Sequence, residues 1–310
     1  MRYAKSVVDL IGNTPLLALD RVNVHGSARL FGKCEFLNPV AIKDRPALYM
    51  IQEAEKRGDL SPGATLVEAT SGNTGMALAY IGRMRGYRVV LCMSEIQSLE
   101  RRKVLQALGA ELVLTPKAEG TKAAKAKALE IHGNTPGSFY VGQHDNPDNP
   151  LAHAETTGPE LWRDTDGTID VFVAPLGTGG TLTGVARALR PKKPSVRIMG
   201  VEPEEAPFIS RGLFTPHRMM GTSPGFTPGV LERDLLDEIL LVSEDDAFQT
   251  CRILAEEEGI LVGISSGASV CAALRLSKDP AYADMVIVAM LCDSGERYLS
   301  VEGLFVGDGV

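Results

Sequence analysis

A polar, glycine-containing turn at residues 70–74 has the composition of an anion-binding site. It reads Thr-Ser-Gly-Asn-Thr and joins a strand-like run at 64–68 to a stretch at 74–86 whose apolar residues recur with helical spacing. Backbone N–H groups at the start of a helix lack partners within the helix, and the helix dipole adds partial positive charge there. The turn is therefore expected to bind a carboxylate or a phosphate. An ordinary helix cap is the alternative interpretation.

A second such turn follows a strand-like run at 169–174. Residues 176–184 read Leu-Gly-Thr-Gly-Gly-Thr-Leu-Thr-Gly, and a helical pattern is expected after them. Glycines expose backbone N–H groups and let a phosphate approach closely, while Thr178 and Thr181 add hydroxyl donors. The spacing matches neither the dinucleotide-binding fingerprint nor the P-loop, which indicates a phosphate that is not part of a nucleotide. A glycine-rich turn that packs closely on its own helix is the alternative.

Lys43 is the candidate nucleophile. It ends the stretch Asn-Pro-Val-Ala-Ile-Lys at 38–43 and precedes a predicted helix whose first turn holds Asp44 and Pro46. Positive charge is disfavoured at a helix N-terminus and by burial, so an amine held there is biased towards its neutral, nucleophilic form. A lysine considered alone is more often a solvated surface residue.

These features occur in an order that resembles the cysteine synthase and cystathionine β-synthase family of pyridoxal phosphate enzymes, which have fold type II. The matching motifs are NPVAIKDRPA around Lys43, EATSGNTG at 68–75, GTGGTLTG at 177–184 and GISSGA at 263–268. The resemblance extends from residue 11 to residue 300. The segment 146–160 is most similar to the O-acetylserine sulfhydrylase, or cysteine synthase, branch of the family.

The resemblance implies a role for each motif. Lys43 is expected to form a Schiff base with pyridoxal 5'-phosphate and later to move the α-proton of the substrate. Ser265 matches the partner of the pyridine nitrogen, and a serine cannot keep that nitrogen protonated, which favours β-elimination followed by addition. A helix-capping role is the alternative for Ser265. The other implied cofactor-binding residues are Asn73, Gly177, Thr178, Gly179, Gly180 and Thr181, and those implied for the substrate α-carboxylate are Thr70, Ser71, Gly72, Thr74 and Gln143.

The implied reaction is β-replacement on O-acetyl-L-serine by sulfide, which yields L-cysteine and acetate through an aminoacrylate. One alternative is cystathionine β-synthase or O-phosphoserine sulfhydrylase activity, in which Arg211 or Arg218 would meet a substrate phosphate. Another is a poorly catalytic regulatory binding partner, which only an altered loop before Lys43 supports. The resemblance also implies a homodimer, and it implies that the active site can bind the C-terminal tail of serine acetyltransferase.

Two departures from the family pattern bear on the choice of substrate. The stretch Asn38-Pro-Val-Ala-Ile-Lys43 is one residue shorter than the family's, and Ala41 stands where a serine is expected. The segment 221–226 reads Gly-Thr-Ser-Pro-Gly-Phe in place of Gly-Ile-Gly-Ala-Gly-Phe. Its proline and hydroxyl groups are expected to stiffen or polarise the wall that faces the second substrate.

The composition is typical of a metabolic enzyme. The chain of 310 residues is 44% hydrophobic, enough for a sizeable core, and its net charge of -7 argues against general nucleic-acid binding. No apolar run approaches the ~20 residues that span a bilayer, and no signal segment is recognised. The five cysteines contain no Cys-x-x-Cys, and the five histidines lack the spacing of metal ligands. Because Lys43 already supplies a base, His153 is expected to make a structural hydrogen bond rather than to act in catalysis. We expect a cytoplasmic enzyme with small-molecule substrates, without metal, nucleic acid or membrane.

Strand-like runs alternate with helical patterns along the chain. The runs lie at 29–36, 64–68, 88–93, 111–115, 169–174, 196–202, 239–243 and 285–291. The alternation predicts an α/β fold with largely parallel sheets, and in such sheets ligands bind at the carboxyl ends of the strands.

The resemblance implies the domain organisation. It indicates two doubly wound, three-layer domains of the tryptophan synthase β type, with the cofactor in the interdomain cleft. Residues 1–40 and 144–310 would form a large cofactor-binding domain. Residues 41–143 would form a small, mobile substrate domain.

Overall fold

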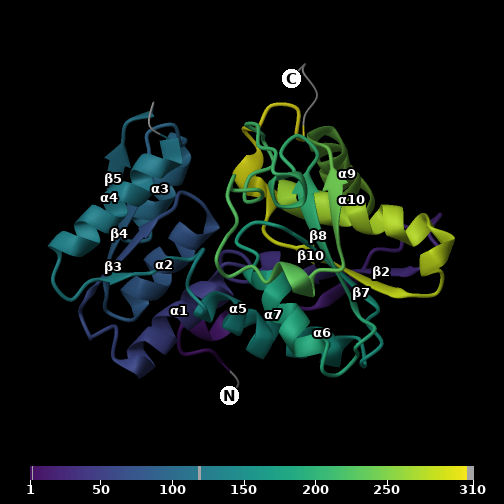
Figure 1. Ribbon diagram of the computed structural model, residues 1–310, viewed down its shortest axis with the longest axis horizontal. Helices are drawn as coiled ribbons and strands as arrows, with labels where there is room; N and C mark the ends of the chain where they lie inside the picture. Colours follow the sequence, from purple (N-terminus) through teal and green to yellow (C-terminus); the bar gives the residue numbers. More distant parts are fainter. Residues whose placement is uncertain (2, 118–119, 306–310) are drawn as a thin grey trace. The chain divides into compact units, whose positions relative to one another are not determined.

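The structure is a computed structural model that describes residues 1, 3–117 and 120–305. The chain forms two compact units (Figure 1). Unit 1 comprises residues 1–11 and 38–149, and unit 2 comprises residues 12–37 and 150–310. Residues 1–11 belong to unit 1 because Val8 and Ile11 pack against its core. The mobility of a small domain stays a prediction.

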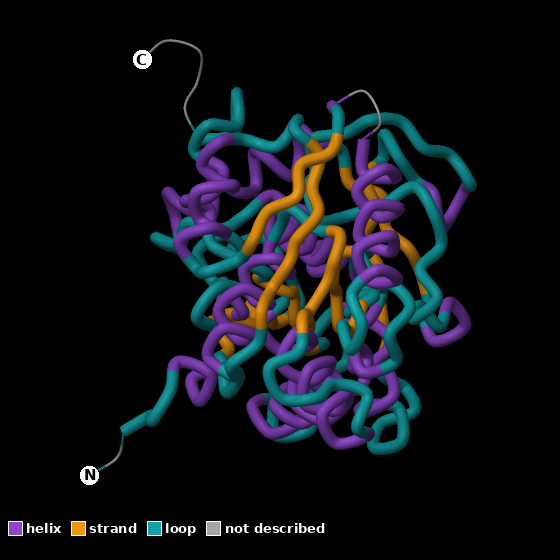
Figure 2. The backbone as a smooth tube through the Cα atoms, turned by 90° about the vertical axis from the view of Figure 1, so that its left-hand side faces the viewer, coloured by secondary structure: helices purple, strands orange, loops and turns teal. Residues whose placement is uncertain are grey.

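Unit 1 is built on a parallel four-stranded sheet, and its strands run side by side in Figure 2. The strand order is β5 (Glu111–Thr115), β4 (Arg88–Ser94), β3 (Thr65–Ala69), β6 (Phe139–Tyr140). The helices are α1 (Asp44–Arg57), α2 (Asn73–Met84), α3 (Leu99–Ala107) and α4 (Gly120–Asn134), and a 3-10 turn forms Val7–Leu10.

The two faces of this sheet have separate apolar cores. Successive side chains along a strand point to opposite faces. Leu66 of β3 and Leu91 of β4 pack with residues of α1 and α2, whereas Val67 and Cys92 pack with residues of α4. Helices therefore cover both faces, as the alternation of strands and helices predicted.

Unit 2 is built on a six-stranded sheet that is parallel except for the pair β1 and β2. The strand order is β1 (Leu16–Ala18), β2 (Arg29–Cys34), β10 (Val286–Leu291), β7 (Val171–Pro175), β8 (Arg197–Pro203), β9 (Glu238–Val242). The helices are α6 (Gly158–Asp164), α7 (Gly180–Leu189), α8 (Phe208–Arg211), α9 (Glu244–Glu257) and α10 (Ile264–Lys278), and α5 (Asp148–Ala152) carries the chain into this unit. Short 3-10 helices are present at Glu35–Leu37, Arg233–Leu235, Pro280–Tyr282 and Gly295–Tyr298.

All eight predicted strands are present in the structure. The predicted end of β2 at residue 36 and the predicted start of β7 at residue 169 differ most, since the strands end at Cys34 and begin at Val171. Strands β1 and β6 were not predicted. With three and two residues, they are too short to show the alternation of apolar and polar side chains that marks a strand.

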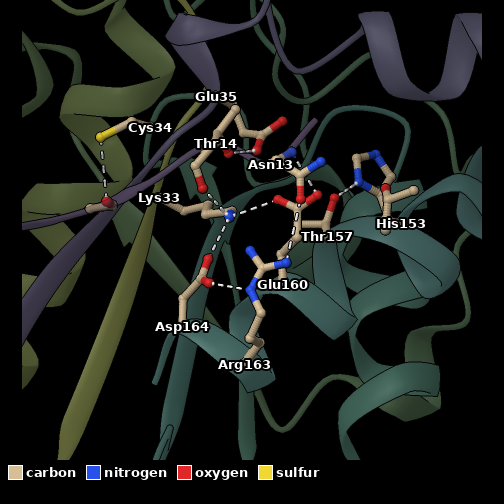
Figure 3. A network of polar contacts seen from close by, with 12 residues as sticks. Asn13, Thr14, Lys33, Cys34, Glu35, His153, Thr157, Glu160, Arg163 and Asp164 are labelled. Atoms are coloured by element: carbon tan, nitrogen blue, oxygen red, sulfur yellow. Dashed lines mark hydrogen bonds and ion pairs between the residues drawn. The ribbon is translucent and has the colours of Figure 1, made fainter. Parts of the chain in front are cut away.

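A buried ion pair joins β2 to α6 within unit 2 (Figure 3). Lys33 has no exposed surface, and its Nζ donates to the carbonyl oxygen of Thr14 at 2.5 Å and to Oε2 of Glu160 at 2.8 Å. Oδ2 of Asp164 lies 3.3 Å from the same nitrogen. The other oxygen of Glu160 accepts the backbone N–H of Asn13 at 2.9 Å. Lys33 therefore ties the segment before β1 to α6.

We expect Lys33→Met to lower the free energy of unfolding by about 3 kcal/mol, because it removes one partner of a buried ion pair. The loss should fall at the low end of the range for buried pairs, since Asp164 is partly exposed and also pairs with Arg163. Urea unfolding of the purified variant measures it. In the control, Lys56→Met, the lysine is 68% exposed and pairs with Glu53 on the surface of α1, so a change below about 0.5 kcal/mol is expected. Equal stability of the two variants would contradict the prediction.

Candidate active site

Lys43 occupies the N-cap position of α1, as its place before a predicted helix suggested. The residue is half-buried, and the loop before it closes on the next side chain. Oδ2 of Asp44 accepts the backbone N–H groups of Val40 at 2.8 Å and Ala41 at 3.4 Å. Asp44 and Ala41 are both fully buried, and a hydroxyl group at position 41 would require a hydrogen-bonding partner there. The shortened loop is therefore a closed, tightly held turn.

The polar turn at 70–74 leads directly into α2. The N-cap of this helix is Gly72, which has no side chain with which to cap the first turn. The N-terminal end of the helix is thus compatible with the anion predicted for it. Oγ1 of Thr74 donates to Oε1 of Gln143 at 2.7 Å, and both residues are buried. Two residues predicted to bind one substrate group therefore contact each other, although 69 positions separate them in the chain.

Glu68 lies just before this turn, and sequence reasoning assigned it no role. Its side chain is 2% exposed. Burial raises the pKa of this carboxyl group to about 7, although the N–H groups of Ala69 and Gln143 act in the opposite direction. Burial also lowers the pKa of His144, the residue that follows Gln143, to about 4. The signal that could have identified Glu68 is a carboxylate inside an apolar strand that leads into a polar turn.

The glycine-rich turn of unit 2 connects β7 to α7. The helix was expected to begin after Gly184, and that expectation is wrong because α7 begins at Gly180. Gly179 forms the N-cap with a φ of 81°, which lies in the left-handed region that favours glycine. This conformation turns the chain into the helix immediately after the strand. Gly179 has no side chain with which to cap the first turn of α7.

Close packing leaves no room for a side chain at two glycines of this turn. A Cβ atom at Gly177 would lie 2.3 Å from the carbonyl oxygen of Gly221, and one at Gly179 would lie 2.7 Å from Cβ of Leu231. The turn therefore packs closely, but against other loops of unit 2 rather than on its own helix. Thr178 and Thr181 are buried within it. Oγ1 of Thr178 accepts the N–H of Gly180 at 3.3 Å.

His153 supports this turn from a π-helical segment, His153–Thr157. Its ring is fully buried. Nδ1 lies 2.9 Å from Oγ1 of Thr157, a contact drawn in Figure 3, and Nε2 lies 3.2 Å from Oγ1 of Thr181. The expected structural hydrogen bond of His153 is confirmed, and it orients a hydroxyl group of the glycine-rich turn.

Ser265 is the second residue of α10 and is 8% exposed. The N-cap of this helix is Gly263, so the capping role considered for Ser265 is not observed. The neighbouring Ser266 has a structural contact, because its Oγ accepts the N–H of Cys292 at 2.8 Å.

The altered segment 221–226 is anchored through its hydroxyl groups. Oγ1 of Thr222 donates to the carbonyl oxygen of Met219 at 2.6 Å, and Oγ of Ser223 donates to that of Ala206 at 2.6 Å. Ser223 has a φ of 37°, and its N–H donates to Leu176 O at 2.8 Å. Both side chains are buried. The added hydroxyl groups therefore stiffen the segment rather than present polar groups to a substrate.

Of the two arginines considered for a substrate phosphate, Arg218 is engaged within unit 2. Its Nε lies 2.8 Å from Oε2 of Glu244, and its guanidinium group lies over the ring of Phe248. Arg211, the last residue of α8, is exposed.

All five cysteines are buried, and none forms a disulfide bond within the part of the chain that the structure describes. Among the residues that the structure describes, no cluster of three or more His, Cys, Asp or Glu side chains is arranged to hold a metal ion. Within the same described ranges, no helix has the length and apolar character needed to cross a membrane.

Comparison with known proteins gives consistent matches. The family model described as "Pyridoxal-phosphate dependent enzyme" matches residues 7–293. Cysteine synthase A of Salmonella typhi is 48% identical over 300 residues, which cover 94% of this chain and 92% of that protein. A crystal structure of cysteine synthase from Entamoeba histolytica superposes with a TM-score of 0.95 at 37% identity and covers 100% of this chain and 93% of the other. The crystal structure of O-ureido-L-serine synthase superposes with a TM-score of 0.94 at 43% identity, with coverage of 100% and 98%.

Proposed function

The chain belongs to the family of pyridoxal-phosphate dependent enzymes, and we propose that it is a cysteine synthase. The reaction is β-replacement on O-acetyl-L-serine by sulfide, which yields L-cysteine and acetate. The observation that carries the proposal is the similarity to cysteine synthases along nearly the whole chain. Retention of Lys43 and of both polar helix starts supports a catalytic protein rather than a binding partner alone.

The glycine-rich turn fits the phosphate of the cofactor. The N-cap of α7 is a glycine without a capping side chain, so backbone N–H groups at the start of the helix can bind an anion. The absence of side chains at Gly177 and Gly179 allows the turn to pack closely. We assign Gly177, Thr178, Gly179, Gly180 and Thr181 to the phosphate group.

Pyridoxal phosphate supplies an aldehyde that reacts with amines and a ring that takes up charge from the α-carbon. We assign Lys43 to hold the cofactor covalently and to move the proton at the substrate α-carbon through its Nζ. Asn73 and Ser265 are assigned to the polar atoms of the ring.

We assign the substrate α-carboxylate to the turn before α2. The positive end of the helix dipole at Gly72 favours the negative charge. Thr74 donates its hydroxyl proton to Oε1 of Gln143, which leaves the amide nitrogen of that side chain as its donor to a substrate. Thr70 and Ser71 complete the carboxylate site in this assignment.

On the family resemblance alone, we extend the proposal to assembly and location. We infer a cytoplasmic homodimer in which residues 41–143 form the mobile substrate domain. We further infer that the active site accepts the C-terminal tail of serine acetyltransferase. Light scattering after size-exclusion chromatography tests the dimer, and titration with the tail peptide tests the partner. A monomer, or a peptide that does not bind, would remove the corresponding inference.

Initial rates with competing substrates test the function. We expect kcat/KM for O-acetyl-L-serine to exceed that for O-phospho-L-serine, or for L-serine with homocysteine, by about tenfold or more. For O-phospho-L-serine the physical reason is that Arg218 already forms an ion pair with Glu244, so its guanidinium group is not reserved for a substrate phosphate. A preference for O-phospho-L-serine would contradict the proposal.

The similarity to O-ureido-L-serine synthase favours a second candidate function, since its identity to this chain is 43%. That product has the serine oxygen bonded to a urea nitrogen, so the nucleophile that replaces acetate must be hydroxyurea. The same assay therefore includes hydroxyurea in place of sulfide, with both products identified by mass spectrometry. We expect sulfide to give the higher kcat/KM, and the opposite order would establish the second candidate.

A further inference from the structure

Glu68 is a buried carboxyl group, at the penultimate position of β3, to which the proposed reaction assigns no task. Its Oε1 accepts the N–H of Ala69 at 2.9 Å, and its Oε2 accepts the N–H of Gln143 at 3.2 Å. The backbone N–H of Gly142 also acts to lower the pKa of this carboxyl group. Gly142 has a φ of 62°, a conformation that glycine adopts readily.

The contact with Glu68 is one of three that hold Gln143. The carbonyl oxygen of Gln143 accepts from Nδ2 of Asn149 at 2.8 Å, and its Oε1 accepts from Oγ1 of Thr74 at 2.7 Å. The N–H, the carbonyl group and the side-chain oxygen each have a partner. The direction in which the side-chain amide nitrogen points is consequently set by these contacts, and Glu68 provides the only one of them that comes from β3.

We propose that Glu68 is a positioning residue that holds Gln143 in the orientation needed to bind the α-carboxylate of the amino-acid substrate. This inference rests on the proposed function, because it takes Gln143 to be a substrate-binding residue. Glu68 acts through the backbone of Gln143 and is not itself assigned a contact with the substrate.

The charge of Glu68 matters to this role. A carboxylate accepts hydrogen bonds at both oxygens, whereas a protonated carboxyl group carries a donor on one of them and accepts less. Burial raises the pKa of Glu68 to about 7, and the positive charge of Lys125 on α4 acts against that rise.

The other titratable neighbours of Glu68 do not change charge in the same range. Burial raises the pKa of Cys92 on β4 to about 11, and it raises the pKa of Tyr140 on β6. Both stay neutral near pH 7. As the pH falls through about 7, Glu68 gains a proton and its hold on Gln143 weakens. The affinity for a carboxylate substrate is expected to fall with it.

The test compares Glu68→Gln with the wild-type holoenzyme. The amide keeps the shape of the side chain but sets an NH2 group against a backbone N–H. We expect KM for O-acetyl-L-serine to rise about tenfold, with kcat changed by less than about threefold and the cofactor absorbance unchanged. The decline of kcat/KM below pH 7 should also disappear. Glu130→Gln, the same change at an exposed position of α4, is the control and should match the wild type.

Two further comparisons separate positioning from general stability. The preference of the wild type for O-acetyl-L-serine over its methyl ester should shrink in Glu68→Gln, because only the free acid uses the carboxylate site. In a Gln143→Ala background, Glu68→Gln should add less than about twofold to KM, since its route of action is gone. An unchanged ratio of acid to ester, additive effects in the double variant, or a retained pH profile would overturn the inference.

Binding measurements keep this test apart from the test of function. The dissociation constants of L-serine and L-serine methyl ester, from changes in the absorbance of the bound cofactor, require no turnover. A wild type that binds both ligands but does not convert O-acetyl-L-serine would remove the proposed function. The comparison of these dissociation constants between the wild type and Glu68→Gln would still decide the role of Glu68.

Discussion

Lys43→Ala is expected to lower kcat for L-cysteine formation by about a thousandfold or more, because it removes the amine that carries the covalent link and moves the α-proton. The substitution lies at the N-cap of α1, where no side-chain capping bond is lost, so the fold should persist. The matched control is Lys56→Ala in the last turn of the same helix, where the lysine is 68% exposed. It should retain the wild-type rate.

A chemical readout accompanies the rates. Borohydride reduction should fix the cofactor to a peptide that contains Lys43 in the wild type and in Lys56→Ala, and should fix none in Lys43→Ala. Attachment to another lysine, or more than about a tenth of the wild-type rate in Lys43→Ala, would refute the assignment.

Gly177→Ala is expected to reduce the cofactor bound per chain by about tenfold or more at equal cofactor concentration. A Cβ atom at this position would lie 2.3 Å from the carbonyl oxygen of Gly221, and neither group is a flexible side chain that could move away. Either the glycine-rich turn or the segment that follows Met220 must shift. Since Ser223 anchors that segment to Leu176 and Ala206, the turn is expected to move, and the N–H groups at the start of α7 move with it.

The control for this substitution is Gly133→Ala in α4. A Cβ built there has no described atom within 4 Å apart from its own stretch of helix, so full cofactor content is expected, with stability equal to the wild type or higher by about 0.5–1 kcal/mol. Absorbance of the purified proteins measures cofactor content, and urea unfolding measures stability. Full cofactor content in Gly177→Ala would show that the packing around the turn does not set the phosphate site.

Much of the fold was predictable because local patterns and tertiary packing agree. The eight predicted strands are apolar runs, and each of the two polar turns lies where one of these strands is followed by a helix. Lys43 could be placed at a helix start because Asp44 and Pro46 are typical of a first helical turn.

The remaining features depend on contacts between distant parts of the chain. The early start of α7 depends on the backbone conformation of Gly179, which a run of several glycines does not specify. The hydroxyl groups of Thr222 and Ser223 were expected to stiffen or polarise the wall that faces the second substrate, and the sequence could not decide between the two. They donate to backbone carbonyl groups that only the fold brings close. The role proposed for Glu68 could not be predicted from the sequence for the same reason, since its partner Gln143 lies 75 positions away.

The most direct test of the proposed function follows the absorbance of the purified holoenzyme while O-acetyl-L-serine and then sulfide are added, with L-cysteine measured at the end. A cysteine synthase is expected to show a change in the cofactor spectrum on the first addition, a return of the spectrum on the second, and L-cysteine formed in proportion to enzyme. A spectrum that ignores O-acetyl-L-serine, or one that changes without L-cysteine being formed, would contradict the proposed function.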